Sequence, residues 1–282
     1  MRKTLTTVAV VAVGLIGSLA ASAPSHAATA PKPTPHSNCQ FVFLIPHQDD
    51  ELLTMGAGIR QHVNAEGGGA NVCAAMMTTG VGSGVKNAMK TPSFNPDGKA
   101  YYLTDEQFRG ARDKETWNAL VHMGVPASNI YLNGYGTPST GVNRLRDDNN
   151  GSPEQAARID GWMKDTINYF GTPRHYKTMT DRSSDTGDHR EMGRTLRRLS
   201  TTPGYSTKIS SARFYVEPYR RTSVTGSVGN VVPTAADKVQ LQKANNSFRV
   251  WNPTSSYYRI GYRSVTSLFD AHYSNPISYQ HS

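Results

Sequence analysis

After its first few dozen residues the chain has no long hydrophobic run, no internal repeat and no segment with the composition of a linker. Its one long apolar stretch, residues 7–21, is short for a membrane span and follows Arg2 and Lys3. Small residues come next and end in an A-x-A-like site at Ala27. This order predicts a secretory signal peptide over residues 1–27, cleaved after Ala27, and a secreted protein without stable membrane insertion. An uncleaved anchor is the alternative.

Cysteine is also scarce, which limits the kinds of site that the chain can build. The two cysteines are Cys39 and Cys73, and no C-x-x-C pair is present. Zinc binding by this pair is therefore not expected. Two cysteines in an exported chain predict one disulfide, and both stand at or near the start of a predicted strand. Two buried free thiols are the alternative.

Acidic residues are fewer than basic ones, with 21 Asp and Glu against 30 Lys and Arg and a formal net charge of +9. The densest basic cluster falls largely on one side of a predicted helix, as a solvated face does; it consists of Arg190, Arg194, Arg197 and Arg198. Because no motif interleaves basic and aromatic residues, nucleic-acid binding is not predicted. For an exported chain, the positive charge favours an anionic wall or surface as neighbour.

Apolar runs and helical patterns alternate through the rest of the chain. Residues 28–38 are rich in proline and predict a disordered leader, while 39–282 are enough for one domain with its own core. Strands are predicted at 40–45, 71–79, 129–133, 176–180 and 212–217, with helices at 51–64, 104–124 and 152–171 and after His189. This alternation predicts an α/β fold with a mostly parallel, doubly wound (Rossmann-like) sheet and helices on both faces. Residues 220–282 are weakly patterned, and their fold is not predicted.

The unusual sequence follows the carboxyl ends of these strands, where such sheets bind ligands. His47 and Asp50 follow the first strand, and His189 follows the fourth beside acidic residues. A hydrolytic zinc site needs about three nitrogen or oxygen ligands and one open position. His47, Asp50 and His189 could supply the three ligands. The alternative is that Asp49, Asp50 and the following glutamate only cap the next helix and suit its positive end.

Four segments resemble one enzyme family in the correct order. The segment P-H-Q-D-D-E (46–51) resembles the signature of the PIG-L/LmbE-like zinc de-N-acetylases, whose usual form is [AP]-H-P-D-D-E. MMTTGVGSG (76–84) resembles the T-x-G turn of that family. ARDKETWNALVHMGV (111–125) resembles its R-x-x-E helix, and GDHREMG (187–193) resembles its P-D-H-x-x-x-G segment. The resemblance spans roughly residues 40–195.

By position, the resemblance implies that His47, Asp50 and His189 bind Zn²⁺ and that Asp49 is the general base. In such chemistry the zinc ion polarises the amide oxygen and activates water, whose proton the base accepts. The implied reaction converts the acetamido group of a sugar or glycoconjugate into a free amine and acetate. A zinc amidase acting on a non-sugar amide, or a catalytically impaired carbohydrate-binding relative, stays open as an alternative.

The resemblance also implies two substrate-binding residues. Arg112 matches the arginine of R-x-x-E, and Asp147 lies in RLRDD, which resembles another substrate-contacting stretch. Arg112 could instead pair with an acidic neighbour on its own helix, Asp113 or Glu115. The oligomeric state is not predicted.

Two positions depart from the family pattern. Gln48 replaces the usual proline, and because it is not a ligand, little effect is expected. Thr186 stands where the family often has a histidine that helps to polarise the scissile carbonyl. Asp185, Asp188 and Tyr135 are candidates for that role.

Overall fold

The structure, a computed structural model, describes residues 38–65, 68–133, 140–147, 152–184 and 187–282. The predicted signal peptide, nearly all of the predicted leader, and Tyr135, Asp185 and Thr186 lie outside these residues. Among the described residues, no helix combines the length and the apolar composition needed to cross a membrane.

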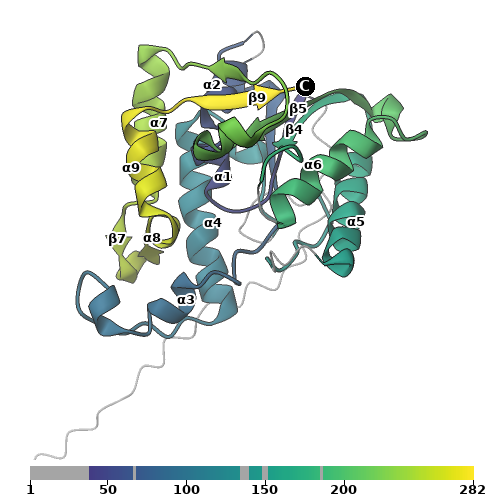
Figure 1. Ribbon diagram of the computed structural model, residues 1–282. Coiled ribbons are helices and arrows are strands. Elements are labelled where there is room, and N and C mark those ends of the chain that lie inside the picture. The colour runs from purple at the N-terminus through teal and green to yellow at the C-terminus, as the bar shows by residue number, and fades with distance from the viewer. Residues whose placement is uncertain (1–37, 66–67, 134–139, 148–151, 185–186) are drawn as a thin grey trace, which may run out of the picture. The chain divides into compact units, whose positions relative to one another are not determined.

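The described residues form a single α/β domain around a seven-stranded sheet (Figure 1). The strand order is β3-β2-β1-β4-β5-β9-β6, and the bounds are β1 Phe41–Ile45, β2 Val72–Met76, β3 Ile130–Tyr131, β4 Arg174–Met179, β5 Ile209–Val216, β6 Gly229–Val231 and β9 Ser278–His281. β1 to β5 run parallel, whereas β9 is antiparallel to both β5 and β6. A separate antiparallel pair joins β7 (Trp251–Asn252) to β8 (Tyr257–Tyr258). The predicted α/β, mostly parallel, doubly wound fold is confirmed.

Helices cover both faces of the sheet. Their bounds are α1 Asp50–Leu53, α2 Gly56–Val63, α3 Val85–Ala88, α4 Asp105–His122, α5 Pro153–Phe170, α6 Gly187–Leu199, α7 Ala235–Ser247, α8 Ile260–Ser264 and α9 Thr266–Ser274. Short 3₁₀ turns include η1 Gly68–Asn71, η2 Pro92–Phe94, η3 Ala127–Asn129, η4 Ser206–Lys208, η5 Pro218–Ser223 and η6 Pro253–Ser255. In Figure 1, α5 and α6 lie on one side of the sheet, and α4, α7 and α9 lie on the other.

The alternation of side chains along β1 explains the two layers. Phe43 and Ile45 are buried in a core with α1, α2, α4, α7 and α9. Val42 and Leu44 are buried in a second core with α5 and α6. Successive side chains of a strand point to opposite faces, so an unbroken apolar run is what a doubly covered strand requires.

Capping residues mark the starts of two helices that the sequence predicts. Thr104 and Gln107 form a capping box at α4. At α5, Ser152 accepts a hydrogen bond from the backbone N–H of Gln155, and Pro153 occupies the first helical position.

The prediction of one continuous helix over 51–64 is wrong, because the segment forms two helices, α1 and α2, with a break after Leu53. The backbone N–H groups of Thr54 and Met55 both bond to the carbonyl oxygen of Asp50, which widens the turn. α2 then packs so closely on β5 that a Cβ at Gly58 would collide with the Tyr215 ring.

Two smaller differences concern the segments around the site. α3 and η2, which lie between β2 and α4, were not among the predicted elements. The helix predicted to follow His189 begins at Gly187, so His189 lies in its first turn.

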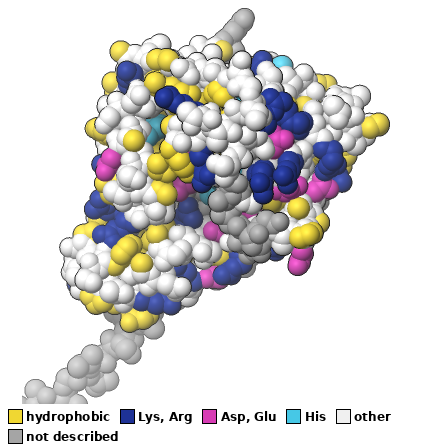
Figure 2. Space-filling model, viewed as in Figure 1, with side chains coloured by type: hydrophobic (Ala, Val, Ile, Leu, Met, Phe, Trp, Pro, Cys, Tyr) yellow, Lys and Arg dark blue, Asp and Glu magenta, His cyan; other side chains and the backbone are white. Residues whose placement is uncertain are grey.

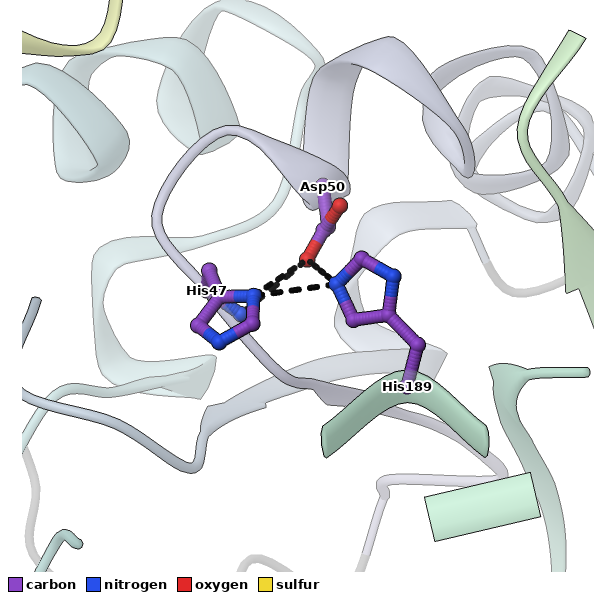
Figure 3. Close-up of side chains that lie close together, drawn as sticks. All are labelled: His47, Asp50 and His189. Carbon is purple, nitrogen blue, oxygen red and sulfur yellow. Dashed lines mark hydrogen bonds and ion pairs between the residues drawn. The ribbon is translucent and has the colours of Figure 1, made fainter. Parts of the chain in front are cut away.

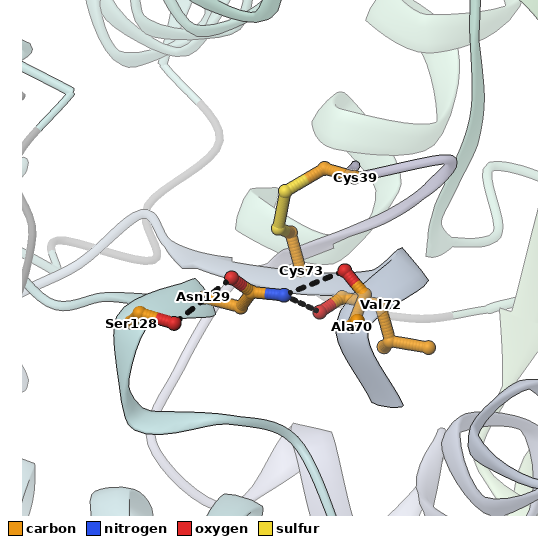
Figure 4. Close-up of a disulfide and its surroundings, with 6 residues drawn as sticks. All are labelled: Cys39, Ala70, Val72, Cys73, Ser128 and Asn129. Atoms are coloured by element: carbon orange, nitrogen blue, oxygen red, sulfur yellow. Dashed lines mark hydrogen bonds between the residues drawn. A yellow bond between two sulfur atoms is a disulfide. The ribbon is translucent and has the colours of Figure 1, made fainter. Parts of the chain in front are cut away.

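The predicted disulfide is present (Figure 4). Cys39 precedes β1 and Cys73 lies in β2, with Cα atoms 5.5 Å apart. β1 and β2 are neighbouring parallel strands, and Cys39 lies just before β1. Beside the bond, the Asn129 amide donates to the carbonyl oxygens of Ala70 and Val72 at 2.9 and 3.0 Å.

Candidate active site

The strand order brings the ends of β1 and β4 together, and this is the point where the sheet changes its direction of winding. β2 and β3 extend on one side of β1, and β4 and β5 on the other. Loops diverge at such a switch point and leave a crevice. The turn after β1 carries His47 and Asp50, while His189 comes from the first turn of α6 after β4.

His47, Asp50 and His189 point toward one another (Figure 3). His189 Nε2 lies 2.9 Å from His47 Nδ1 and 3.0 Å from Asp50 Oδ2. His47 Nδ1 and Asp50 Oδ2 are 3.4 Å apart. The ligand atoms of the three lie within 4.8 Å of one another. Two imidazole nitrogens and one carboxylate oxygen form a donor set that suits Zn²⁺. The three residues named from the sequence thus form a group that could hold a metal ion.

A second carboxylate, Asp188, orients the first of these histidines. Asp188 Oδ2 accepts a hydrogen bond from His47 Nε2 at 3.0 Å, and Asp188 is 1% exposed. When His47 binds a metal as a neutral ring with its proton on Nε2, its Nδ1 lone pair faces Asp50 and His189. Sequence reasoning considered Asp188 only as a partner for the carbonyl. Its adjacency to His189 was the available signal.

Charges around the triad shift the protonation of its members. Burial lowers the pKa of His47, but Asp188 and Asp50 outweigh burial and raise it to about 9. Burial raises the pKa of Asp50, but His189 and His47 reverse that effect and hold it well below its usual range. Asp50 is therefore a carboxylate at neutral pH.

Asp49 occupies the cap position of α1, yet its side chain makes no capping bond. Its φ of 140° is unfavourable for a residue other than glycine. The Glu51 carboxylate holds this backbone by accepting the Asp49 N–H at 2.9 Å. The Asp49 carboxylate accepts a hydrogen bond from the Ser264 hydroxyl at 3.4 Å and lies 3.6 Å from Arg112 Nη2. The capping interpretation thus accounts for the position of Asp49 but not for its carboxylate, which lines a cavity.

Burial and the neighbouring Asp50 charge raise the pKa of Asp49 to about 6, against the opposing effect of Arg112. Burial likewise raises the pKa of Glu51 to about 8. Carboxyl groups of this kind, buried in a cleft beside charged partners, are common in catalytic sites.

Arg112 is only 4% exposed and lines the same cavity. Its guanidinium donates to the carbonyl oxygens of Gln48 at 2.6 Å and Gly80 at 3.2 Å. The alternative, an ion pair of Arg112 with Asp113 or Glu115 on its own helix, is not found in the structure. Asp113 pairs with Arg144, and Glu115 accepts the N–H groups of Ile260 and Gly261.

Asp147 also lines the cavity. Its Oδ1 accepts the N–H of Gly82 at 3.0 Å, which ties the loop after β3 to the glycine-rich loop after β2. Arg112 and Asp147 thus both line the cavity, and their role as substrate-binding residues stays a prediction.

Gln48, the residue in place of the usual proline, is fully buried in a polar network. Its amide donates to Asp113 Oδ1 at 3.1 Å and to the Thr78 carbonyl oxygen at 3.3 Å. Arg144 also pairs with Asp113 at 2.7 Å and donates to Leu132 O at 2.9 Å. The network connects the segments after three parallel strands. The expectation of little effect therefore understates what this side chain holds together.

The sequence did not identify the residues that the C-terminal segment brings to the cavity. These are Ser264, Val265, Leu268, Ala271, His272, Asn275 and Tyr279, together with Glu217, Pro218 and Tyr219 after β5. Part of 220–282, whose fold was not predicted, thus lines the cavity. Individual side chains were beyond reach because they arrive through long-range packing of α8, α9 and β9.

Comparison with solved structures finds deacetylases at low sequence identity, and two of them, with TM-scores of 0.52 and 0.50, share the fold. The A40926 pseudoaglycone deacetylase Dbv21 is 15% identical with a TM-score of 0.52, covering 81% of this chain and 85% of that one. A deacetylase–teicoplanin complex from the biosynthesis pathway of teicoplanin is 17% identical with a TM-score of 0.50, covering 86% and 100%. The N,N'-diacetylchitobiose deacetylase from Pyrococcus horikoshii is 15% identical with a TM-score of 0.46, covering 86% and 79%.

A search among curated proteins gives no match. The sequence model described as PIG-L, GlcNAc-PI de-N-acetylase, matches residues 42–200, more than half of the 282 residues. The matched region contains the whole His–Asp–His group, Asp49, Arg112 and Asp147. The chain therefore belongs to the PIG-L family.

Proposed function

We propose that the chain is a secreted, zinc-dependent hydrolase that removes the N-acetyl group of an amino sugar, releasing acetate and a free amine. One observation carries this proposal: a His–Asp–His donor set lies beside Asp49, a buried carboxylate outside that set, in the same cavity. Family membership supports the de-N-acetylase reaction, and the family description supports an N-acetylglucosamine unit as the substrate.

His47, Asp50 and His189 would hold the zinc ion, with Asp188 fixing the ring of His47. When bound in such a set, Zn²⁺ supplies a Lewis acid for the amide oxygen and lowers the pKa of a coordinated water. The remaining chemistry falls to side chains of the chain itself.

Asp49 is the proposed general base. It takes a proton from the attacking water and later returns one to the leaving amine. Ser264 and Arg112 restrict its carboxylate, and Glu51 restricts its backbone. A base held in this way needs little reorganisation as the reaction proceeds.

Arg112 and Asp147 are the proposed contacts for the sugar. Both line the cavity, and they offer one cationic and one anionic group on its polar side. A guanidinium and a carboxylate suit hydroxyl groups because one donates hydrogen bonds and the other accepts them.

Export is part of the proposal and rests on the predicted signal peptide at 1–27. The Cys39–Cys73 disulfide supports export, because disulfides persist in oxidising compartments.

The test pairs metal analysis with an acetate-release assay on the purified exported protein, using N-acetylglucosamine and its oligomers. Zinc near one equivalent and acetate release from these sugars are expected. Bound zinc with hydrolysis of unrelated amides only would contradict the substrate class. Bound zinc without any turnover would contradict the catalytic role.

A further inference from the structure

A row of basic side chains crosses the sheet on the face that α2 covers, toward the amino ends of the strands. In the parallel register, Lys177 of β4 is the partner of Phe43 of β1 and of Arg213 of β5. One step nearer the strand starts, His175 is the partner of Phe41. Phe43 belongs to the core that α2 shares, and residues two apart in a strand point to the same face. The row therefore lies on the α2 face, away from the carboxyl ends that carry the His–Asp–His group.

Lys177, in the middle of this row, is a buried cation without a counter-charge. It is 5% exposed, and within the part of the chain that the structure describes its ammonium group has no hydrogen bond and no ion pair. Its Nζ lies 5.7 Å from the centroid of the Phe41 ring, a contact that offsets only part of the cost of burying the charge. Lysine is almost never buried to this extent unless it is paired. Burial and the charge of Arg213 lower the pKa of Lys177 to about 8, so the group is still mostly a cation at pH 7.

The neighbours of Lys177 are basic as well. Arg213 stands beside it on the next strand, and two cations side by side repel each other. His62, in the last turn of α2, stacks on the Phe41 ring with 4.0 Å between the ring centroids, and His175 stacks on the same ring at 5.2 Å. Burial and the charge of Lys177 lower the pKa of both histidines, and no carboxylate of the described residues opposes these effects. The fold thus gathers four basic side chains around one place and supplies no acidic side chain to balance them.

The basic residues of α6 show the ordinary arrangement, in which cations have acidic partners. Arg194 pairs with Glu191, and Arg197 pairs with Asp181. Figure 2 shows Lys and Arg side chains gathered over the region of α6, with Asp and Glu side chains among them. Lys177 therefore differs from the charges of a solvated helix face, both in its burial and in its lack of a partner.

The row is open to a ligand from the surface. His62, His175 and Arg213 are only partly buried. The Arg213 guanidinium donates to the Ser282 hydroxyl group and has no ion pair with any described residue. An anion bound there would neutralise the buried ammonium group and relieve the repulsion between the two cations. Arginine offers a planar fork of donors and lysine a point charge, and both suit the oxygens of a phosphate group.

We propose that Lys177 and Arg213, flanked by His62 and His175, form a binding site for a phosphate group. None of these four residues lines the active-site cavity. The phosphate site is therefore separate from the proposed catalytic centre and does not depend on the proposed function.

The phosphate group could be the free inorganic ion or part of an organic molecule. Calorimetric titration of the purified, metal-loaded protein with inorganic phosphate and with glycerol phosphate, at constant ionic strength, separates these sources. A ligand of the folded state should also raise the midpoint of urea unfolding. Binding of inorganic phosphate alone assigns the site to the free ion, and binding of glycerol phosphate assigns it to a phosphorylated molecule.

Lys177→Met tests the site, because methionine keeps a long side chain in the same place and removes the charge. Without phosphate the variant should be at least as stable as the wild type, since it loses an unpaired buried cation. Its Kd for phosphate should rise by about tenfold or more, the usual effect of losing a hydrogen bond to a charged group. Arg213→Gln should weaken binding in the same direction. Lys164→Met is the matched control, because Lys164 pairs with Asp160 on α5, and it should bind phosphate as the wild type does.

Phosphate bound at a metal ion in the active site would be retained by Lys177→Met, so the difference between this variant and the wild type is the decisive quantity. Equal phosphate affinity in the two proteins would overturn the site. Failure of the wild type to bind either compound would overturn it too. If Lys177→Met does not fold, the same comparison with Arg213→Gln decides.

Discussion

Asp188 accepts a hydrogen bond from Nε2 of His47 at 3.0 Å, on the ring nitrogen that does not face Asp50. Both residues come from segments that are far apart in the sequence, the turn after β1 and the start of α6. The bond fixes the tautomer and the ring orientation of His47, so the metal-binding capacity of this histidine depends on its partner.

Asp188→Asn should weaken zinc binding by about 10–100-fold, because an amide can no longer fix the tautomer of His47 as a carboxylate does. A competition titration with a chelator measures the change. Glu191→Gln is the control on the same helix, because the Glu191 carboxylate pairs with Arg194. The zinc affinity of this variant should match that of the wild type. Equal affinity in Asp188→Asn would show that Asp188 does not support the ligand.

Removal of the disulfide by Cys39→Ala together with Cys73→Ala should lower the free energy of unfolding by about 3–4 kcal/mol. The bond closes a loop with a sequence separation of 34, and a loop of that length restricts the unfolded chain by roughly this amount. Urea unfolding measures the loss. A reducing agent should destabilise the wild type and leave the double variant unchanged; a wild type insensitive to reduction would contradict the bond.

Gln48→Ala should cost about 1–3 kcal/mol of stability, the penalty for leaving buried polar partners unsatisfied. Its amide supports both Asp113 and the Thr78 carbonyl group. Gln61→Ala is the matched control because Gln61 is exposed on α2, and it should change stability by less than about 0.5 kcal/mol. If urea unfolding gave equal midpoints for the two variants, the hydrogen bonds of Gln48 would not contribute to stability.

The buried His272 should make the free energy of unfolding depend on pH in the acidic range. Burial lowers its pKa to about 4, although a backbone bond at Leu52 opposes the shift. The unfolded chain takes up this proton near pH 6.5, before the folded chain does. The free energy of unfolding should therefore fall between about pH 6.5 and pH 4, by up to about 1.4 kcal/mol for each pH unit.

His272→Gln removes the titratable imidazole, so the free energy of unfolding of this variant should depend less on pH between pH 6.5 and pH 4. Urea unfolding at pH 7, 6, 5 and 4 measures the difference between the two proteins. A constant difference across these values would mean that His272 titrates alike in the folded and unfolded chains.

The sequence predicted most of the sheet because the signals there are local. The run that became β1 is apolar without a break, and this pattern alone indicates a strand covered on both faces. The position of His47 and Asp50 past its end then placed the site on the correct edge. The break between α1 and α2 was not predicted; there the backbone N–H groups of Thr54 and Met55 share the carbonyl oxygen of Asp50.

The C-terminal side of the site escaped prediction for a similar reason. Ser264 lies 215 residues from Asp49 in the sequence, and no periodic pattern links them. The apolar cavity-lining positions of this segment are Val265, Leu268 and Ala271, and three such positions over seven residues do not distinguish a core face from a cavity wall. Only the packing of α9 beside α1 makes that surface part of the site.

The central claim is that Asp49 transfers the proton while His47, Asp50 and His189 hold the metal ion. Acetate release by Asp49→Asn, measured at a zinc occupancy shown to equal that of the wild type, tests it most directly. Full zinc occupancy is expected, with a rate lower by about 10²–10⁴-fold, the usual contribution of general acid–base catalysis. A rate equal to that of the wild type at the same occupancy would contradict it.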